Sequence, residues 1–376
     1  MQIAIVHDYI KEYGGAERVV EALLEIWPES DIYTLLYSPK YLGPHRMRVK
    51  KWKIKTSFLQ NIPFKEKLIS YFRVIAPWMF RSFDLSKYDV VIVSAAGTYT
   101  SPNLVKMGKK TLHICYCHTP PRYLYGYSTA QDWQGIWWRK ILKFFGTVPM
   151  HFLRMADFQA AQLPDYFIAN SKETAGRIKK FYRRDATVIY APVDVPASAS
   201  RAPQSKLYYL AGGRLARPKR VDLAVKASAK LGLRLKVFGK EFAGYGEELK
   251  KMAGEKVEFL GEVTDEEKTK LMSGAKAFIF PAEEEDFGIT PVEAMGVGTP
   301  VIAYRSGGVV ESVVDGKTGV FFNEPTVESL SLAIKKFEKM KFNPEDCIAQ
   351  AQKFSKERFK KEMKEFVRTH AEKKYR

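Results

Sequence analysis

Short apolar runs alternate with longer amphipathic stretches along the whole chain. In the first half, the runs at 3–6, 90–93, 112–115 and 166–169 have the character of buried strands. A second series follows at 208–211, 233–238, 257–260, 277–280 and 301–304. Several of these runs are followed by amphipathic stretches, such as 221–231 and 265–272, which predict helices. This alternation predicts βα units arranged around parallel sheets.

A break between the two series predicts two domains. Residues 195–203 are small, include two prolines and have no hydrophobic period, so they are typical of a linker. A length of 376 residues also suits two domains. We therefore expect Rossmann-like domains at 1–195 and 196–353, facing one another across a cleft, and a charged C-terminal helix at 354–376.

Composition limits the class of protein. Hydrophobic residues make up 46% of the chain, which is enough for packed cores despite a formal charge of +19. Three cysteines are too few for a disulfide framework and favour a reducing compartment. The N-terminus shows no secretory signal, and no apolar run reaches the length of a membrane-spanning helix. These features predict an intracellular protein whose positive charge needs a partner.

The densest positive charge lies at 46–73, where nine basic residues accompany one acid, Glu66. Bulky apolar residues such as Trp52, Phe64 and Trp78 are interleaved with these cations or follow them. This composition favours a segment that lies on an anionic membrane surface. A solvated face over an ordinary core helix and a nucleic-acid site remain alternative interpretations. Residues 133–158 have a similar mixture of aromatic and basic residues.

Two glycine-containing loops follow strands and are candidates for binding anions. Gly14 and Gly15 stand between the first strand and a predicted helix, where backbone amides and the positive helix end can approach a phosphate. A tight turn explains this pair equally well. In the second half, Gly212 and Gly213 precede Arg214 and Lys219, whose charges are suited to neutralising a diphosphate.

The loop at 281–288 carries the strongest chemical signal. It combines acids at 283–286 with Gly288, and it leads into Thr290-Pro291-Val292-Glu293, which predicts a helix with Thr290 as its N-cap. A capping box would explain Glu293 but not Gly288 or the acids before it. Carboxylates at a helix start can accept hydrogen bonds from sugar hydroxyls, and free amides near Gly288 can hold phosphate. Glu285 and Glu293 are therefore placed to flank one elongated ligand.

The spacing from Glu285 to Glu293 resembles the E-x7-E signature of retaining glycosyltransferases of family 4, which have the GT-B fold. The following residues 293–303, Gly307-Gly308 and 315–319 are similar to the same family, as are 117–123, 170–171 and 188–194 in the first half. These similarities run in order along nearly the whole chain. The subgroup it most resembles is the mannosyltransferases that use GDP-mannose in O-antigen-type glycan assembly. Asp286 departs from the glycine common in the family, and the turn at 239–241 lacks the usual G-x-G-P.

The resemblance implies a two-domain GT-B fold, with a C-terminal helix that can return to the N-terminal domain, and a role for each matched residue. Arg214 and Lys219 would bind the donor diphosphate, with backbone groups at Gly14, Gly15, Phe287, Gly288 and Ile289. Glu293 would hold the ribose hydroxyls and Glu285 the hydroxyls of the donor sugar, while His118 would contact the transferred sugar. Retention would proceed by front-face attack, in which a donor phosphate oxygen accepts the proton of the acceptor.

No metal or other cofactor is expected, because the cations and amides would stabilise the leaving group and the sequence has no Asp-x-Asp. The run from His113 to His118 contains Cys-x-Cys, which places both thiols on one strand face and lacks the spacing of a structural zinc site.

Three functions follow as hypotheses. The first is transfer of mannose from GDP-mannose to a lipid-linked or glycan acceptor at the cytoplasmic face of a membrane, which residues 46–80 would contact, with no nucleic acid involved. The second is a synthase or phosphorylase with a small soluble acceptor. The third is a non-catalytic membrane-binding or nucleic-acid-binding protein that retains the fold, against which the presence of Arg214, Lys219, Glu285 and Glu293 argues.

Overall fold

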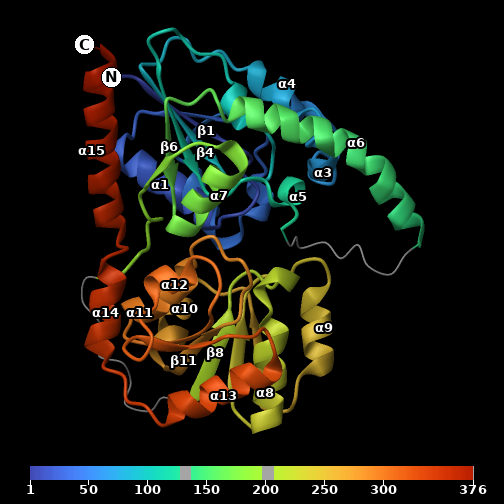
Figure 1. Cartoon of the computed structure of the whole chain (residues 1–376), viewed down its shortest axis with the longest axis vertical. Coiled ribbons are helices and arrows are strands. Elements are labelled where there is room, and N and C mark those ends of the chain that lie inside the picture. The colour runs from blue at the N-terminus through green and yellow to red at the C-terminus, as the bar shows by residue number, and fades with distance from the viewer. Residues whose placement is uncertain (128–136, 197–206, 376) are drawn as a thin grey trace. The chain divides into compact units, whose positions relative to one another are not determined.

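A computed structural model describes residues 1–127, 137–196 and 207–375. In the helix at 137–160, the side chains are described from Pro149 onward. The chain folds into two compact units (Figure 1). Residues 1–127, 137–192 and 357–375 belong to the first unit, and residues 193–196 and 207–356 belong to the second. The expected pair of α/β domains is confirmed, while part of the predicted linker at 195–203 lies outside the described residues.

The first unit is built on a seven-stranded parallel sheet in the order β3-β2-β1-β4-β5-β6-β7. The central strands are buried along their whole length because both sheet faces are covered, as their unbroken apolar runs predicted. The strands are β1 (Ile3–His7), β2 (Asp31–Thr34), β3 (Lys53–Thr56), β4 (Val90–Ala95), β5 (Leu112–Cys117), β6 (Tyr166–Ala169) and β7 (Ala186–Val188).

Helices surround this sheet, and Cys115 and Cys117 project from β5 into the same apolar core, as expected for alternate residues of a strand. Burial raises the pKa of the Cys115 thiol to about 12, which keeps it protonated. The helices are α1 (Gly15–Ile26), α2 (Arg46–Val49), α3 (Ile69–Phe72), α4 (Ala76–Arg81), α5 (Arg122–Tyr125), α6 (Trp137–Ala160) and α7 (Lys172–Tyr182).

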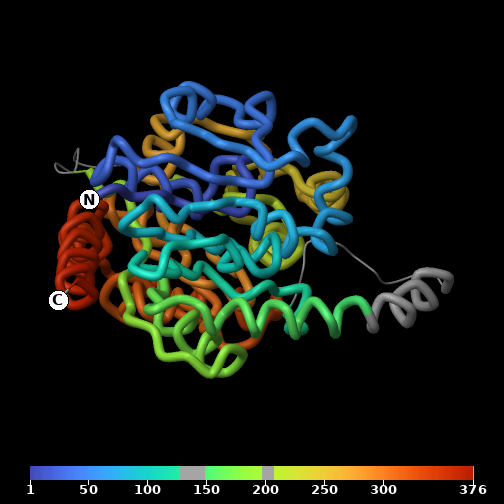
Figure 2. Tube along the Cα trace, turned by 90° about the horizontal axis from the view of Figure 1, so that it is seen from above, coloured from blue at the N-terminus to red at the C-terminus, as the bar shows by residue number. Residues whose placement is uncertain are grey.

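The C-terminal helix α15 (Lys356–Tyr375) returns to the first unit, as the resemblance implied. It lies beside the N-terminus in both views (Figures 1 and 2). The Arg358 guanidinium donates to the Tyr190 carbonyl at 2.8 Å, and the Tyr375 hydroxyl donates to the Asp89 carbonyl at 2.7 Å. The Phe359 ring packs edge-on against Tyr116 with a centroid distance of 5.8 Å.

The second unit contains a six-stranded parallel sheet in the order β10-β9-β8-β11-β12-β13. Its strands are β8 (Tyr208–Gly212), β9 (Leu235–Phe238), β10 (Val257–Gly261), β11 (Ala275–Phe280), β12 (Val301–Tyr304) and β13 (Gly319–Phe322). Its helices are α8 (Val221–Leu231), α9 (Tyr245–Met252), α10 (Asp265–Ser273), α11 (Ile289–Gly296), α12 (Val309–Ser312), α13 (Val327–Glu338) and α14 (Pro344–Gln352).

Four strands were not predicted, namely β2, β3, β7 and β13, and each contains only three or four residues. Strand β3 is an edge strand on which Lys53 and Lys55 are exposed, so its apolar signal is weak. In the described residues, no helix has both the length and the apolar character needed to cross a bilayer.

Candidate active site

The cationic loop of the second unit leaves the carboxyl end of β8, where ligands of parallel α/β sheets bind. Gly213 has a φ of +119°, and a Cβ at Gly239 would lie 1.7 Å from the Gly213 carbonyl oxygen, so two loop backbones pass one another where no side chain fits. Arg214 then emerges as an exposed side chain, with its guanidinium carbon 5.9 Å from the centre of the Phe242 ring.

The loop at 281–288 meets this cationic loop through paired charges. The Lys219 ammonium forms an ion pair with the Glu285 carboxylate, and the Arg220 guanidinium forms one with Glu283. The Glu283 amide also donates to the Pro218 carbonyl at 3.0 Å. The structure therefore brings together two of the residues predicted for donor binding, one cation and one carboxylate, at the carboxyl ends of β8 and β11.

Gly307 and Gly308 support the loop that carries Glu285. The Gly308 amide donates to the Glu285 carbonyl at 2.8 Å. A Cβ at Gly307 would lie 2.3 Å from that carbonyl oxygen, and one at Gly308 would lie 2.4 Å from the Asp286 carbonyl oxygen. The two glycines noted in the sequence are thus required by a close backbone approach.

Helix α11 begins differently from the prediction. Its N-cap is Gly288, with φ +87°, and no side chain caps the helix, so the expected Thr290 N-cap and its capping box with Glu293 are wrong. The left-handed conformation that glycine allows turns the chain into the helix two residues earlier. Glu293 instead pairs with Lys268 of α10 at 2.7 Å, and both side chains are largely buried.

Two other residues predicted to bind the donor, Phe287 and Ile289, stand on either side of Gly288. The Phe287 side chain is 2% exposed and packs against Phe354, with a ring-centroid distance of 5.5 Å, so only its backbone is suited to contact a ligand. Ile289 is half-buried in the first turn of α11, next to Gly288.

In the first unit, Gly14 is the N-cap of α1 and Gly15 is its first residue. The Gly14 amide donates to the Glu17 carboxylate at 2.8 Å, so a side chain of the helix itself occupies this predicted phosphate donor. Glu17 is only 4% exposed.

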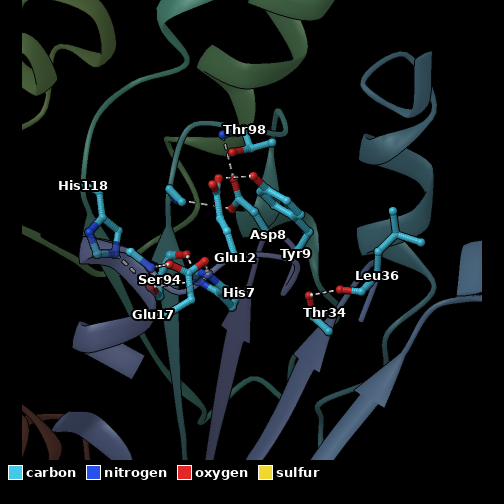
Figure 3. A network of polar contacts seen from close by, with 12 residues as sticks. His7, Asp8, Tyr9, Glu12, Glu17, Thr34, Leu36, Ser94, Thr98 and His118 are labelled. Atoms are coloured by element: carbon cyan, nitrogen blue, oxygen red, sulfur yellow. Dashed lines mark hydrogen bonds and ion pairs between the residues drawn. The ribbon is translucent and has the colours of Figure 1, made fainter. Parts of the chain in front are cut away.

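His118 follows the end of β5 and lies in a buried polar network (Figure 3). Its Nε2 is 2.9 Å from the Ser94 hydroxyl of β4, and Nδ1 of His7, from β1, is 3.1 Å from the same hydroxyl. Nε2 of His7 in turn lies 3.4 Å from the Glu17 carboxylate. Sequence reasoning missed His7, Ser94 and Glu17. His7 and Ser94 lie at the carboxyl ends of central strands and Glu17 lies in the first turn of α1, where such reasoning looks for chemistry.

Burial and neighbouring charges set the protonation of this network. Burial, with the charge of His7, lowers the pKa of His118 to about 3, so His118 is neutral. Burial also opposes a charge on His7, but the hydrogen bond and charge of Glu17 and the charge of Asp8 outweigh it and raise the pKa of His7. Asp8 accepts hydrogen bonds from the backbone amides of Thr98 at 2.9 Å and Tyr99 at 3.1 Å.

Known protein families match both units. A model described as Glycosyltransferase Family 4 matches residues 13–196, and one described as Glycosyl transferases group 1 matches residues 197–354. The chain belongs to the family 4 glycosyltransferases. It is accordingly a hexosyltransferase, an enzyme that takes a nucleotide-sugar donor and a glycan acceptor.

Individual relatives agree with this family. The glycosyltransferase is 26% identical over 367 residues to alpha-1,3/1,6-mannosyltransferase ALG2 of Mus musculus, covering 86% of this chain and 84% of that one. Sucrose-phosphate synthase from Thermosynechococcus elongatus has a TM-score of 0.69 at 16% identity and covers 98% of this chain and 99% of its own. The Anabaena protein HepE, solved in complex with UDP, has the same score and identity and covers 98% and 100%. These solved structures confirm the GT-B fold of the glycosyltransferase.

The predicted site residues of the glycosyltransferase thus fall into two groups. His118, Gly14 and Gly15 lie in the first unit, and the others lie in the second. Their individual roles in donor binding stay predictions.

Proposed function

We propose that this glycosyltransferase transfers mannose from GDP-mannose, with retention, to a lipid-linked or glycan acceptor at the cytoplasmic face of a membrane. The similarity to ALG2 mannosyltransferases along most of the chain is the observation that carries this proposal. Mannose is the transferred sugar of those relatives by name, and GDP-mannose follows from the subgroup that the sequence resembles.

The charges of the second unit support a donor site of this kind. Lys219 and Arg214 would hold the diphosphate. Glu285, which Lys219 contacts, would accept hydrogen bonds from hydroxyls of the sugar. Glu293, paired with Lys268, would accept hydrogen bonds from the ribose hydroxyls. Charged hydrogen bonds at partly buried positions are stronger than neutral ones, which suits recognition of a dianionic diphosphate.

The proposed reaction balances without a metal. The bond between the anomeric carbon and the donor phosphate oxygen breaks, and a bond from that carbon to the acceptor oxygen forms on the same face. The acceptor hydroxyl proton passes to the departing phosphate oxygen. Arg214 and Lys219 would stabilise the charge that develops on the leaving GDP.

The membrane part of the proposal is supported by aromatic side chains exposed on the first unit. Phe64 is 75% exposed, Tyr71 73% and Trp78 60%, all within residues 46–80. Phe72 and Phe80 from the same segment belong to the core, so only part of the apolar signal is available at the surface. Three of its cations, Arg48, Lys53 and Lys55, form ion pairs with acids of the same unit. Phe152 and Met155 of α6 are also exposed, while the remainder of the aromatic and basic stretch at 133–148 lies outside the described side chains.

A thermal-shift panel with GDP, UDP, ADP and their sugars tests the donor, because a ligand that binds only the folded state raises the melting temperature. We expect GDP and GDP-mannose to give the largest shifts, unchanged by a chelator. Incubation with GDP-mannose and a lipid-linked acceptor, followed by NMR of the anomeric proton, then tests retention. A larger shift with UDP-sugars, or a β-linked product, would contradict the proposal.

A further inference from the structure

A continuous chain of buried polar side chains runs through the first unit from α1 to the end of β5 (Figure 3). It passes from Glu17 to His7, then to Ser94 and finally to His118. His7 and Ser94 are fully buried, Glu17 is 4% exposed and His118 is 7% exposed. Polar groups so deeply buried are stable only when their hydrogen bonds are satisfied, so the positions of their protons can be worked out.

The proton on His7 is fixed by a carbonyl group. Nδ1 of His7 is 3.1 Å from the Ser94 carbonyl oxygen, which can only accept, so Nδ1 carries a proton. The same N–H points to the Ser94 hydroxyl oxygen at 3.1 Å, and that oxygen therefore accepts from His7. The single proton of the Ser94 hydroxyl is left for its other neighbour.

That neighbour is Nε2 of His118, at 2.9 Å. If Nε2 were protonated, the fully buried Ser94 hydroxyl would have no acceptor among the described residues, since Nδ1 of His7 already carries a proton. Nε2 of His118 must therefore accept, and the single proton of this neutral imidazole sits on Nδ1. Among the described residues, Nδ1 of His118 has no hydrogen-bond partner, and His118 keeps 7% of its surface exposed, which leaves this N–H available to a ligand.

The surrounding structure holds this arrangement in place. The His118 amide donates to the Ala95 carbonyl at 2.9 Å, and the Thr174 hydroxyl donates to the His118 carbonyl at 3.2 Å. At the other end, the Glu17 carboxylate lies 3.4 Å from Nε2 of His7 and accepts from the Gly14 amide, which ties Gly14 to the same network.

We propose that His7 and Ser94 are positioning residues that hold His118 as the neutral Nδ1–H tautomer, so that its Nδ1–H is the hydrogen-bond donor offered to the transferred sugar. This inference rests on the proposed function and on the expectation, from the family resemblance, that His118 contacts the transferred sugar. A neutral imidazole in water prefers its proton on Nε2, so the protein must impose the opposite tautomer.

Nitrogen NMR of the full chain labelled with ¹⁵N-histidine reads the tautomer directly. We expect His118, assigned by loss of its signals in His118→Asn, to show a protonated Nδ1 and an unprotonated Nε2 in the absence of any ligand. In Ser94→Ala, the proton should return to Nε2. A wild-type His118 with its proton on Nε2, or an Nδ1–H tautomer unchanged in Ser94→Ala, would overturn the positioning role.

Two substitutions at His118 give a second, kinetic test. The Asn side-chain amide places an N–H donor near the position of Nδ1, whereas the Gln amide places one near Nε2. We expect kcat for mannosyl transfer to fall at least about tenfold further in His118→Gln than in His118→Asn, the value of about one hydrogen bond. Equal loss in the two variants, or better activity with Gln, would contradict the assignment.

The two tests separate this inference from the proposed function, since the NMR measurement needs no turnover. An Nδ1–H tautomer in a chain that transfers no mannose would contradict the proposed function alone. An active mannosyltransferase with the Nε2–H tautomer would contradict the positioning role alone.

Discussion

A methyl group added at Gly307 would meet the backbone of Glu285. The new Cβ would lie 2.3 Å from the Glu285 carbonyl oxygen and 2.7 Å from its amide nitrogen, and Gly307 has a φ of +70°. The left-handed conformation costs an alanine about 1–2 kcal/mol, and relieving such a backbone clash costs about 1–3 kcal/mol more. We therefore expect Gly307→Ala to lower the free energy of unfolding by about 2–5 kcal/mol.

Gly261 provides a matched control, because its φ is also +70° and a Cβ there would meet nothing within 4 Å. Gly261→Ala should lose only the conformational part, about 1–2 kcal/mol. Urea denaturation of the full chain measures both variants. Because relief of the clash displaces the loop that carries Glu285, Gly307→Ala should also weaken GDP-mannose binding about tenfold or more, a loss of about 1.4 kcal/mol, while Gly261→Ala should not. Equal stability and equal donor affinity in the two variants would refute this account of the loop.

Three further predictions concern charge and surface. Burial raises the pKa of Asp157 to about 6, so the stability that its protonated form contributes is complete below the unfolded pKa and is lost as the pH rises through 6. Relative to Asp157→Asn, the wild type should therefore lose about 2 kcal/mol of unfolding free energy between pH 4 and 7. Parallel pH profiles of the two proteins would contradict this. Lys268→Ala leaves Glu293 without its ammonium partner and should cost about 1–3 kcal/mol in urea denaturation; an unchanged midpoint would show that the pair contributes nothing. Trp78→Ser should weaken binding to anionic vesicles roughly fivefold. Leu332→Ser, which removes a similarly exposed apolar side chain from the second unit, should leave this binding unchanged. Equal effects of the two substitutions would argue against a membrane surface at 46–80.

The sequence was sufficient for the architecture because buried parallel strands have an unbroken apolar signal. The strands β1, β4, β5 and β6 were all predicted, whereas β3, an exposed edge strand with lysines, was not. The pairing of Lys219 with Glu285 was not predicted as a contact, since the two residues are 66 positions apart and meet only because β8 and β11 are adjacent in the sheet.

Two local features were beyond sequence reasoning for different reasons. The start of α11 was misplaced because the Thr-Pro-x-Glu pattern satisfies the rules for a capping box, yet Gly288 takes a left-handed conformation that begins the helix earlier. His7 and Ser94 were missed because a polar residue on a buried strand has no pattern of its own, and only the adjacency of β1, β4 and β5 reveals the network.

Calorimetric titration of GDP-mannose into the wild type, Lys219→Ala and Lys230→Ala tests the central claim most directly. Lys230 is a half-exposed lysine of the same unit whose ion pair with Glu328 lies outside the predicted site. We expect the wild type and Lys230→Ala to bind equally, and Lys219→Ala to bind about 10- to 150-fold more weakly, the loss of one charged hydrogen bond. Equal affinity in all three proteins would contradict the claim that this glycosyltransferase holds its donor at the carboxyl ends of β8 and β11.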